Sequence, residues 1–416
     1  MPQEKQGLGH LRVLPRRYRS HASGTLGNRN TRPLLHQDES VEPSGQDLTK
    51  YEHLEVDSNC SATLAGVTGR IERIDPGTHR RIKGLRLVTA YGIAALLGTL
   101  PSISHGLHGG ASLSVLAGGI ALWASVSEAR VVRRESSRDL VLLCAAGVVG
   151  AVMIIALAPL LMGPRRPGAE LALATGAFLV GYLKRFGVLG AGVGSQIYLG
   201  QLFAFEMRLT TADLVMVGVA GLIAALSAIV PRLLSGPAEH PAVLLTTVPE
   251  NDELPALFMG LQAALAAVVI VALNDVFGLT ESVWAITAST YVVASSRAGT
   301  MKRVRARIVG TIIGVPLGLA CLPLADHMPM LIWIAAAVAM IVYAMALPER
   351  YDIACAAFAF TLIVTMAAAG DRSVSLLASR IWETVIGGVI GAVAAMVIVP
   401  RIRILSGLRD RFVAGK

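Results

Sequence analysis

The residues with the clearest chemical potential are an arginine and a glutamate inside an apolar segment near the C-terminus. Arg380 and Glu383 are three residues apart, which on a helix places both side chains on one face. A charge inside an apolar membrane segment is expensive and usually faces a partner or a wet cavity. We therefore predict an ionic cluster in which Arg380 pairs with Glu383 or with Glu281. The alternative is a pair of side chains that snorkel to the membrane interface.

Two further candidates lie between the carboxylates along the chain. Trp284 could stack on an aromatic ring. Arg307, together with Arg138, could form a positive vestibule that gathers anions, or both arginines could only mark the cytoplasmic side. Glycines recur every fourth residue from Gly310 to Gly318, a pattern that predicts close packing against another helix.

A glycine-rich stretch at 187–201 carries more polar side chains than its apolar surroundings. Glycine-interrupted spans often form substrate sites in transporters. Gln196 and Tyr198 therefore either hydrogen-bond a ligand or only bond neighbouring helices. The stretch lacks the Lys-Ser/Thr ending of a phosphate-binding loop, which argues against a nucleotide site.

Enzymatic constellations are missing from the sequence. It contains no HExxH, no GxSxG and no paired-cysteine motif, and its four cysteines show no metal-ligand spacing. We predict that the protein is not an enzyme and requires no cofactor and no metal.

The composition indicates the elements that position these residues. Of the 416 residues, 54% are hydrophobic and 16% charged, against about 45–50% and about 25% in soluble domains. Apolar stretches of about 20 residues match the thickness of a bilayer. We predict an all-α polytopic membrane protein with about twelve transmembrane helices, ten being the alternative. The predicted segments are 87–104, 107–127, 139–160, 168–183, 186–205, 212–231, 255–272, 276–296, 306–325, 329–347, 352–369 and 379–400.

The two halves of the chain look duplicated. A constant offset of 169 brings Arg133-Arg134 onto Lys302-Arg303 and Ile229-Val-Pro-Arg232 onto Ile398-Val-Pro-Arg401. Six spans per unit give both halves the same orientation, so we expect two parallel six-helix repeats with any pathway at their interface. The predicted organisation is a disordered basic cytoplasmic tail at 1–82, a first repeat at 83–232, a cytoplasmic linker at 233–253, a second repeat at 254–403 and a cytoplasmic tail at 404–416.

Positive charge is distributed unevenly between the connecting segments. With a cytoplasmic N-terminus, 32 of the 37 Lys and Arg residues lie on the inner side. The positive-inside rule then places both termini in the cytoplasm. This explains the net charge of +9 without a nucleic-acid partner. The expected partners are the lipid bilayer, a small organic anion as substrate and, as a further possibility, a second copy of the chain.

Three short motifs carry a resemblance to a known family. They are Trp284-Ala-Ile-Thr287, Arg307-x-x-Gly-Thr311-x-x-Gly and Arg380-x-x-Glu383-Thr-x-x-Gly. With these motifs the chain resembles the fusaric acid resistance protein family, which includes the bacterial aromatic acid exporters, most strongly over 255–403 and more loosely over 83–235. The resemblance implies an inner-membrane protein with six-span halves, associated with efflux of aromatic carboxylic acids and other toxic compounds. It adds Thr287 and Thr311 to the candidate site. Many members carry a large cytoplasmic domain after each half, whereas this chain has a short linker.

We therefore expect a multi-pass secondary transporter of the bacterial inner membrane. It would export organic anions, in particular aromatic carboxylic acids, or toxic compounds, and draw energy from the proton gradient. Glu281 and Glu383 are the candidates for proton coupling. One alternative is a passive anion channel, and another is a non-transporting membrane scaffold that presents its basic tail to a partner.

Overall fold

The computed structural model describes residues 79–104, 107, 110–130, 132–162, 168–235, 256–277, 282–347, 349–368 and 373–414. Within these ranges the chain forms helices and no strand, as predicted for an all-α protein. The first 78 residues, Glu281 and most of the predicted linker lie outside the described residues, so the predictions for them stay predictions.

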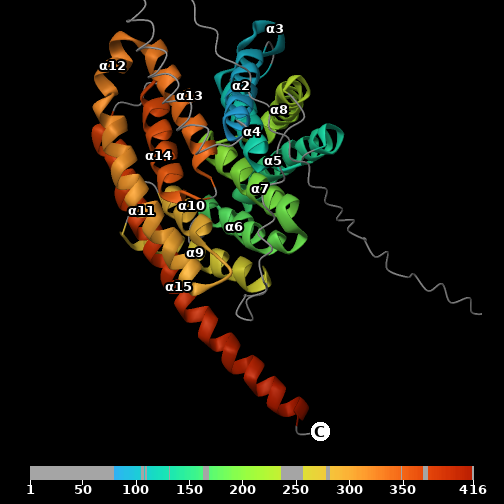
Figure 1. The fold of residues 1–416 in the computed structure, drawn as a ribbon, viewed down its shortest axis with the longest axis vertical. Coiled ribbons are helices and arrows are strands. Elements are labelled where there is room, and N and C mark those ends of the chain that lie inside the picture. Colours follow the sequence, from blue (N-terminus) through green and yellow to red (C-terminus); the bar gives the residue numbers. More distant parts are fainter. Residues whose placement is uncertain are drawn as a thin grey trace, which may run out of the picture. The chain divides into compact units, whose positions relative to one another are not determined.

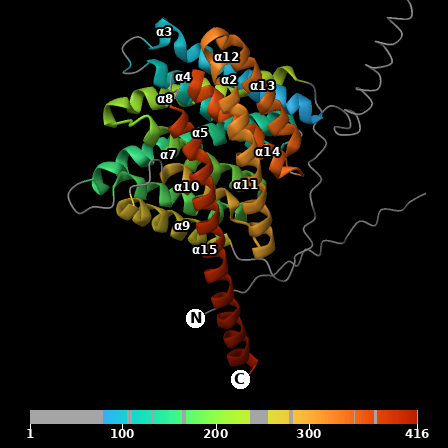
Figure 2. The same cartoon turned by 90° about the vertical axis from the view of Figure 1, so that its left-hand side faces the viewer.

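Seventeen helical segments lie within the described ranges and form the body of the protein (Figures 1 and 2). The first group is α2 (His79–Thr99), α3 (Pro101–Ser104), α4 (Gly110–Ser127), α5 (Arg133–Leu161), η2 (Ala169–Ala172), α6 (Leu173–Tyr182), η3 (Leu183–Phe186), α7 (Gly187–Glu206), η4 (Thr211–Asp213) and α8 (Leu214–Leu234). The second group is α9 (Ala256–Phe277), α10 (Ser282–Val292), α11 (Arg297–Ala320), α12 (Leu322–His327), α13 (Pro329–Ala346), α14 (Tyr351–Ala368) and α15 (Val374–Ala414).

Many of these helices are long and apolar enough to cross a bilayer. Among the described residues, seven runs meet both conditions, and two shorter apolar helices at 113–127 and 330–346 accompany them. The chain is therefore a multi-pass helical membrane protein. The seven runs are Arg133–Leu161, Ala169–Glu206, Thr211–Leu234, Ala256–Val276, Arg297–Leu324, Tyr351–Ala368 and Val374–Val397.

The run from 169 to 206 is a hairpin of two helices. A Cβ placed on Gly194 of α7 would lie 2.5 Å from the Leu179 carbonyl oxygen of α6, and one placed on Gly176 of α6 would lie 3.1 Å from the Tyr198 Cα. Later residues of α7 thus contact earlier residues of α6, so α6 and α7 are antiparallel. The chain reverses at η3, where Gly187 has φ 76°, a conformation that favours glycine.

Glycines bring the backbones of α11 and α14 together, as their spacing predicts. A Cβ on Gly310 would lie 2.6 Å from the Asp352 carbonyl oxygen, and one on Gly318 would lie 2.8 Å from the Ile363 Cβ. The contact partners rise together along both helices, so α11 and α14 are parallel. In the first group, α5 and α7 are parallel for the same reason, since Gly192 lies against Leu143 and Gly200 lies against Gly147.

Each group contains the same kinds of helix neighbours. In the first, α5 packs against α7 and α8, and α4 packs against α8. In the second, α11 packs against α14 and α15, and α10 packs against α15. The groups meet where α6 contacts α9 and where α2 contacts α13. The largest buried core extends from α2 to α10 and so includes residues of both groups.

Helix α11 begins earlier than the hydropathy predicts. The predicted span starts at 306, but α11 starts at Arg297, with the Ser296 hydroxyl accepting a hydrogen bond from the Gly299 N–H at 3.1 Å as an N-cap. The basic stretch before the span is thus helical. Arg307 consequently lies about 15 Å from the start of the helix, at a rise of about 1.5 Å per residue, and not at its mouth.

Candidate functional site

Arg380 and Glu383 form the pair that their spacing predicts. The Arg380 Nη1 and Glu383 Oε2 atoms are 3.7 Å apart, and each side chain is only 4% exposed. The Arg380 guanidinium also lies 4.4 Å from the centre of the Trp284 ring, a cation–π contact, and 3.6 Å from the Met366 sulfur. These four residues are named the Arg380 cluster. The Arg380 and Glu383 side chains are buried between helices, unlike an interfacial snorkelling pair.

Small residues hold α10 against α15 at this point. A Cβ on Gly387 would lie 2.9 Å from the Ala288 Cβ, and one on Gly391 would lie 3.2 Å from the Ser289 carbonyl oxygen. The two helices are parallel and close, which brings Trp284 of α10 beside Arg380 of α15. The Trp284 indole N–H is buried and has no hydrogen-bond acceptor among the described residues. It is a donor available to a bound molecule.

Arg307 lies among tyrosines from four other helices. The Tyr351 hydroxyl is beside its guanidinium, with Tyr291 and Tyr198 also near it, and Tyr343 belongs to the same group. We name these five residues the Arg307 cluster. Within the part of the chain that the structure describes, no carboxylate lies within ion-pair distance of Arg307. The cluster therefore presents a positive charge and several hydroxyl groups without a counter-ion.

Hydroxyl groups connect the Arg307 cluster to α7 and α10. The Tyr198 and Thr287 oxygens are 2.8 Å apart, and the Ser195 and Tyr291 oxygens are 2.7 Å apart. The rings of Tyr198 and Tyr291 meet edge to face with centroids 5.9 Å apart. Of the alternatives for Tyr198, bonding to a neighbouring helix is observed, and this bond joins two of the predicted site residues.

Two other predicted site residues, Gln196 and Thr311, lie outside both clusters. Gln196 is fully buried on the face of α7 that meets Gly147, and neither of its amide atoms has a partner among the described residues. Thr311 is buried on α11, one turn beyond Arg307. Glu281 lies outside the described residues.

The structure places the two residues of the predicted vestibule, Arg138 and Arg307, in different surroundings. Arg138 is exposed on α5, whereas the neighbouring Asp139 is buried. On a helix, consecutive residues point about 100° apart, so the residue after Arg138 faces the bundle instead. Asp139 accepts a hydrogen bond from the Arg130 Nε at 2.9 Å.

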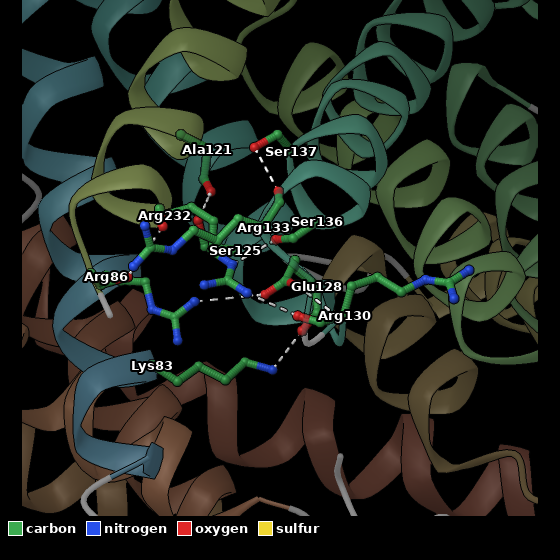
Figure 3. Close-up of polar contacts among 11 residues, drawn as sticks. Lys83, Arg86, Ala121, Ser125, Glu128, Arg130, Arg133, Ser136, Ser137 and Arg232 are labelled. Atoms are coloured by element: carbon green, nitrogen blue, oxygen red, sulfur yellow. Dashed lines mark hydrogen bonds and ion pairs between the residues drawn. The ribbon is translucent and has the colours of Figure 1, made fainter. Parts of the chain in front are cut away.

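Through Arg130, Asp139 joins a partly buried ionic network in the first group that the sequence did not reveal. Figure 3 shows Arg130 together with Arg86, Glu128 and Arg232 of this network. The Arg86 Nη1 lies 3.9 Å from the Glu128 Oε2, and Lys83 donates to the Glu128 carbonyl at 2.8 Å. Arg232 donates to the Ser136 hydroxyl at 2.7 Å and to the Arg130 carbonyl at 3.0 Å. We name these residues (Lys83, Arg86, Glu128, Arg130, Ser136, Asp139 and Arg232) the first-group network. Acidic residues flanking apolar segments were the available signal.

A second polar group joins η2, α9 and α10 at the opposite end of α10 from Tyr291. Glu170 accepts a hydrogen bond from the Ser282 hydroxyl at 2.5 Å and from the Asn274 amide at 3.0 Å. These residues line an open cavity of about 800 Å³ between the two helix groups. Sequence reasoning missed Glu170 because it stands alone at the edge of an apolar segment.

Fold and site together define a multi-pass helical membrane protein with buried cationic clusters. Residues 264–394 match the family described as fusaric acid resistance protein-like. The match includes Trp284, Arg307, Arg380 and Glu383, and it confirms the predicted resemblance to this family. No curated protein and no solved structure shows significant similarity to the chain.

Proposed function

We propose that the protein is a secondary transporter that exports small organic anions, in particular aromatic carboxylic acids, across the bacterial inner membrane. The observation that carries this proposal is Arg307. Its guanidinium lies in a candidate membrane-spanning helix, and no described carboxylate balances it. A buried charge without a counter-ion is costly, and a bound anion would remove that cost. The tyrosine hydroxyls would donate further hydrogen bonds to the same anion.

Helix directions support the topology that we propose for this transporter. Twelve spans require that odd-numbered and even-numbered segments alternate in direction. The parallel pairs α5 with α7 and α11 with α14, and the antiparallel pair α6 with α7, agree with that alternation. The uneven distribution of Lys and Arg then favours cytoplasmic termini.

The packing of the two helix groups supports a two-repeat architecture in the same way. In chain order, the pairs α5 with α7 and α4 with α8 correspond to α11 with α14 and α10 with α15. The contacts between the groups also correspond, because α6 meets α9 where α13 meets α2. Such an arrangement would be related by an axis along the membrane normal, with the pathway between the groups.

In this proposal each cluster has its own task. Arg307 and its tyrosines bind the anion, Trp284 stacks on an aromatic ring, and Glu383 takes up and releases the coupling proton. A carboxylate held beside an arginine inside the membrane is the kind of group that proton-coupled transporters use. The match to the fusaric acid resistance protein-like family favours an aromatic carboxylate as substrate.

The test is anion flux in vesicles that contain the full-length purified protein. Phthalate serves as the probe because it remains ionised at neutral pH, and protein-free vesicles measure its passive leak. We expect phthalate flux above that leak, and a faster flux when a pH gradient is imposed. Flux that ignores the gradient would replace the coupled exporter with a passive anion channel. Flux no greater than the leak would reject transport of this class of anion.

A further inference from the structure

Three side chains that make polar or cation–π contacts lie in succession along one face of helix α10, which we name its polar face. Trp284, Thr287 and Tyr291 are spaced three and four residues apart, so their side chains share a face. Trp284 lies in the Arg380 cluster and Tyr291 in the Arg307 cluster. The opposite face carries Ser289 and packs on the glycines of α15. The polar face of α10 therefore connects the two arginines.

The distance between the clusters along α10 is short. Seven residues separate Trp284 from Tyr291, which corresponds to about 10 Å along a helix axis. Inside a bilayer an anion is held mainly by nearby cations and hydrogen-bond donors, because the hydrocarbon offers it neither. Arg307 and Arg380 would offer two such positions, one toward each end of the same helix face.

One hydrogen bond crosses the polar face of α10 between Trp284 and Tyr291. The Thr287 hydroxyl donates to the Val283 carbonyl at 2.9 Å, so the Tyr198 hydroxyl donates to Thr287 across the 2.8 Å contact. Tyr198 is fully buried and Thr287 is 3% exposed. Tyr198 comes from α7 in the first helix group and Thr287 from α10 in the second. The bond therefore joins the groups at the place where we propose the pathway.

We propose that the polar face of α10 is the anion route between the Arg307 and Arg380 clusters, and that Tyr198 and Thr287 form the constriction that selects what passes. This inference rests on the proposed transport function and adds to it the residues that set the selectivity of the route. An anion that contacts the Arg307 cluster strongly enough would separate the groups and open the bond. A small inorganic anion such as chloride makes fewer contacts with the Arg307 cluster and would not pass the Tyr198–Thr287 hydrogen bond.

The experiment measures chloride leak and phthalate flux through the full-length protein in vesicles. Tyr198→Phe and Thr287→Val each remove one hydroxyl with little change of shape, and both break the same bond. We expect each to raise chloride leak about fivefold or more, and the double variant to leak no more than the single ones. Thr287→Ser keeps a hydroxyl and should leak like the wild type.

Ser289→Ala is the matched control. Ser289 is a buried hydroxyl on the same helix, but its Oγ donates to the Ile286 carbonyl at 2.8 Å on the other face. The control should leave both fluxes unchanged. If Tyr198→Phe and Thr287→Val leak no more chloride than Ser289→Ala while the wild type carries phthalate, the constriction is rejected and the transport proposal stands. If the wild type carries no phthalate, both are rejected. If Tyr198→Phe fails to fold, the comparison of Thr287→Val with Thr287→Ser decides the test.

Discussion

The first-group network contains the buried arginines Arg86 and Arg232, and the Arg307 cluster contains the half-buried Arg307, yet their surroundings differ in one respect. In the network, Glu128 and Asp139 are buried among the basic side chains, and Arg232 donates to a hydroxyl and a carbonyl. In the Arg307 cluster the neighbours are tyrosines. The first arrangement has its own counter-charges, whereas the second has none among the described residues.

The difference distinguishes two roles of an arginine in a membrane segment, stabilising the fold and binding an anion. The sequence alone does not tell these roles apart. A cation whose partners are all within the protein holds helices together, and removing it leaves those partners unsatisfied. A cation that lacks a counter-charge gains most when an anion arrives from outside. The same residue type is thus expected to serve stability in one region and transport in the other. The following variants test that contrast, beginning with the largest expected effect.

Replacing Arg307 by alanine should abolish most anion transport. A hydrogen bond to a charged group contributes about 1.5–3 kcal/mol, so its loss corresponds to a decrease of about tenfold to a hundredfold in phthalate flux. Flux of a neutral aromatic amide should change much less, because it gains no charge-assisted bond. Arg305→Ala is the control, since Arg305 is an exposed arginine on the same helix. An equal loss for the anion and the amide would remove Arg307 from anion binding.

Replacing Arg232 by alanine should destabilise the protein without a comparable loss of transport per folded molecule. The Ser136 hydroxyl and the Arg130 carbonyl would each lose their Arg232 partner. A buried acceptor that loses its hydrogen-bond partner typically costs about 1–3 kcal/mol. We expect a clearly lower Tm in detergent and normal phthalate flux from the protein that remains folded. A stable variant with impaired flux would reverse the assignment of the two regions.

Sequence reasoning identified contacts within one helix better than contacts between helices. The pairing of Arg380 with Glu383 follows from helical spacing alone, because residues three apart are neighbours on any helix. The tyrosines around Arg307 come from α7, α10, α13 and α14, and no spacing in the sequence encodes that meeting. The sequence also did not show which residues of α5 face the bundle. Aligning the two halves at the offset of 169 residues matches the residue type of Arg138 but gives no direction for its side chain.

The helix boundaries show a similar limit. Hydropathy detects the apolar part of a helix and not its charged first turns, although Lys and Arg are good helix formers. Helices α5 and α11 therefore begin at Arg133 and Arg297, within basic runs that the apolar pattern excluded. The apolar runs themselves and the glycine spacing in α11 sufficed to predict an all-α membrane protein and the close contact with α14.

Replacing Glu383 by glutamine tests Arg380, whose surroundings combine features of the first-group network and of the proposed anion route. Arg380 has a carboxylate neighbour like the network and an aromatic neighbour on the proposed route. Glutamine keeps a hydrogen-bonding side chain of similar size but cannot carry the coupling proton. We expect phthalate flux within about threefold of the wild type at equal pH, and no acceleration when a pH gradient is applied. Acceleration that persists in the variant would assign proton coupling to another group.

The smallest effect is expected at an ion pair whose carboxylate is exposed to water. The Arg80 Nη2 and Glu349 Oε1 atoms are 2.6 Å apart, joining the start of α2 to the segment after α13, and the Glu349 side chain is 67% exposed. The Arg80 guanidinium holds the pKa of Glu349 below its ordinary value of 4.5. The pair therefore stabilises the protein above that ordinary pKa, and the stabilisation disappears as the pH falls through the lowered value. Because exposed pairs contribute little, Glu349→Gln should lower Tm by only about 1 °C at pH 7 and leave it unchanged in strong acid. A decrease as large as that of Arg232→Ala would mean that burial does not distinguish the first-group network from a surface contact.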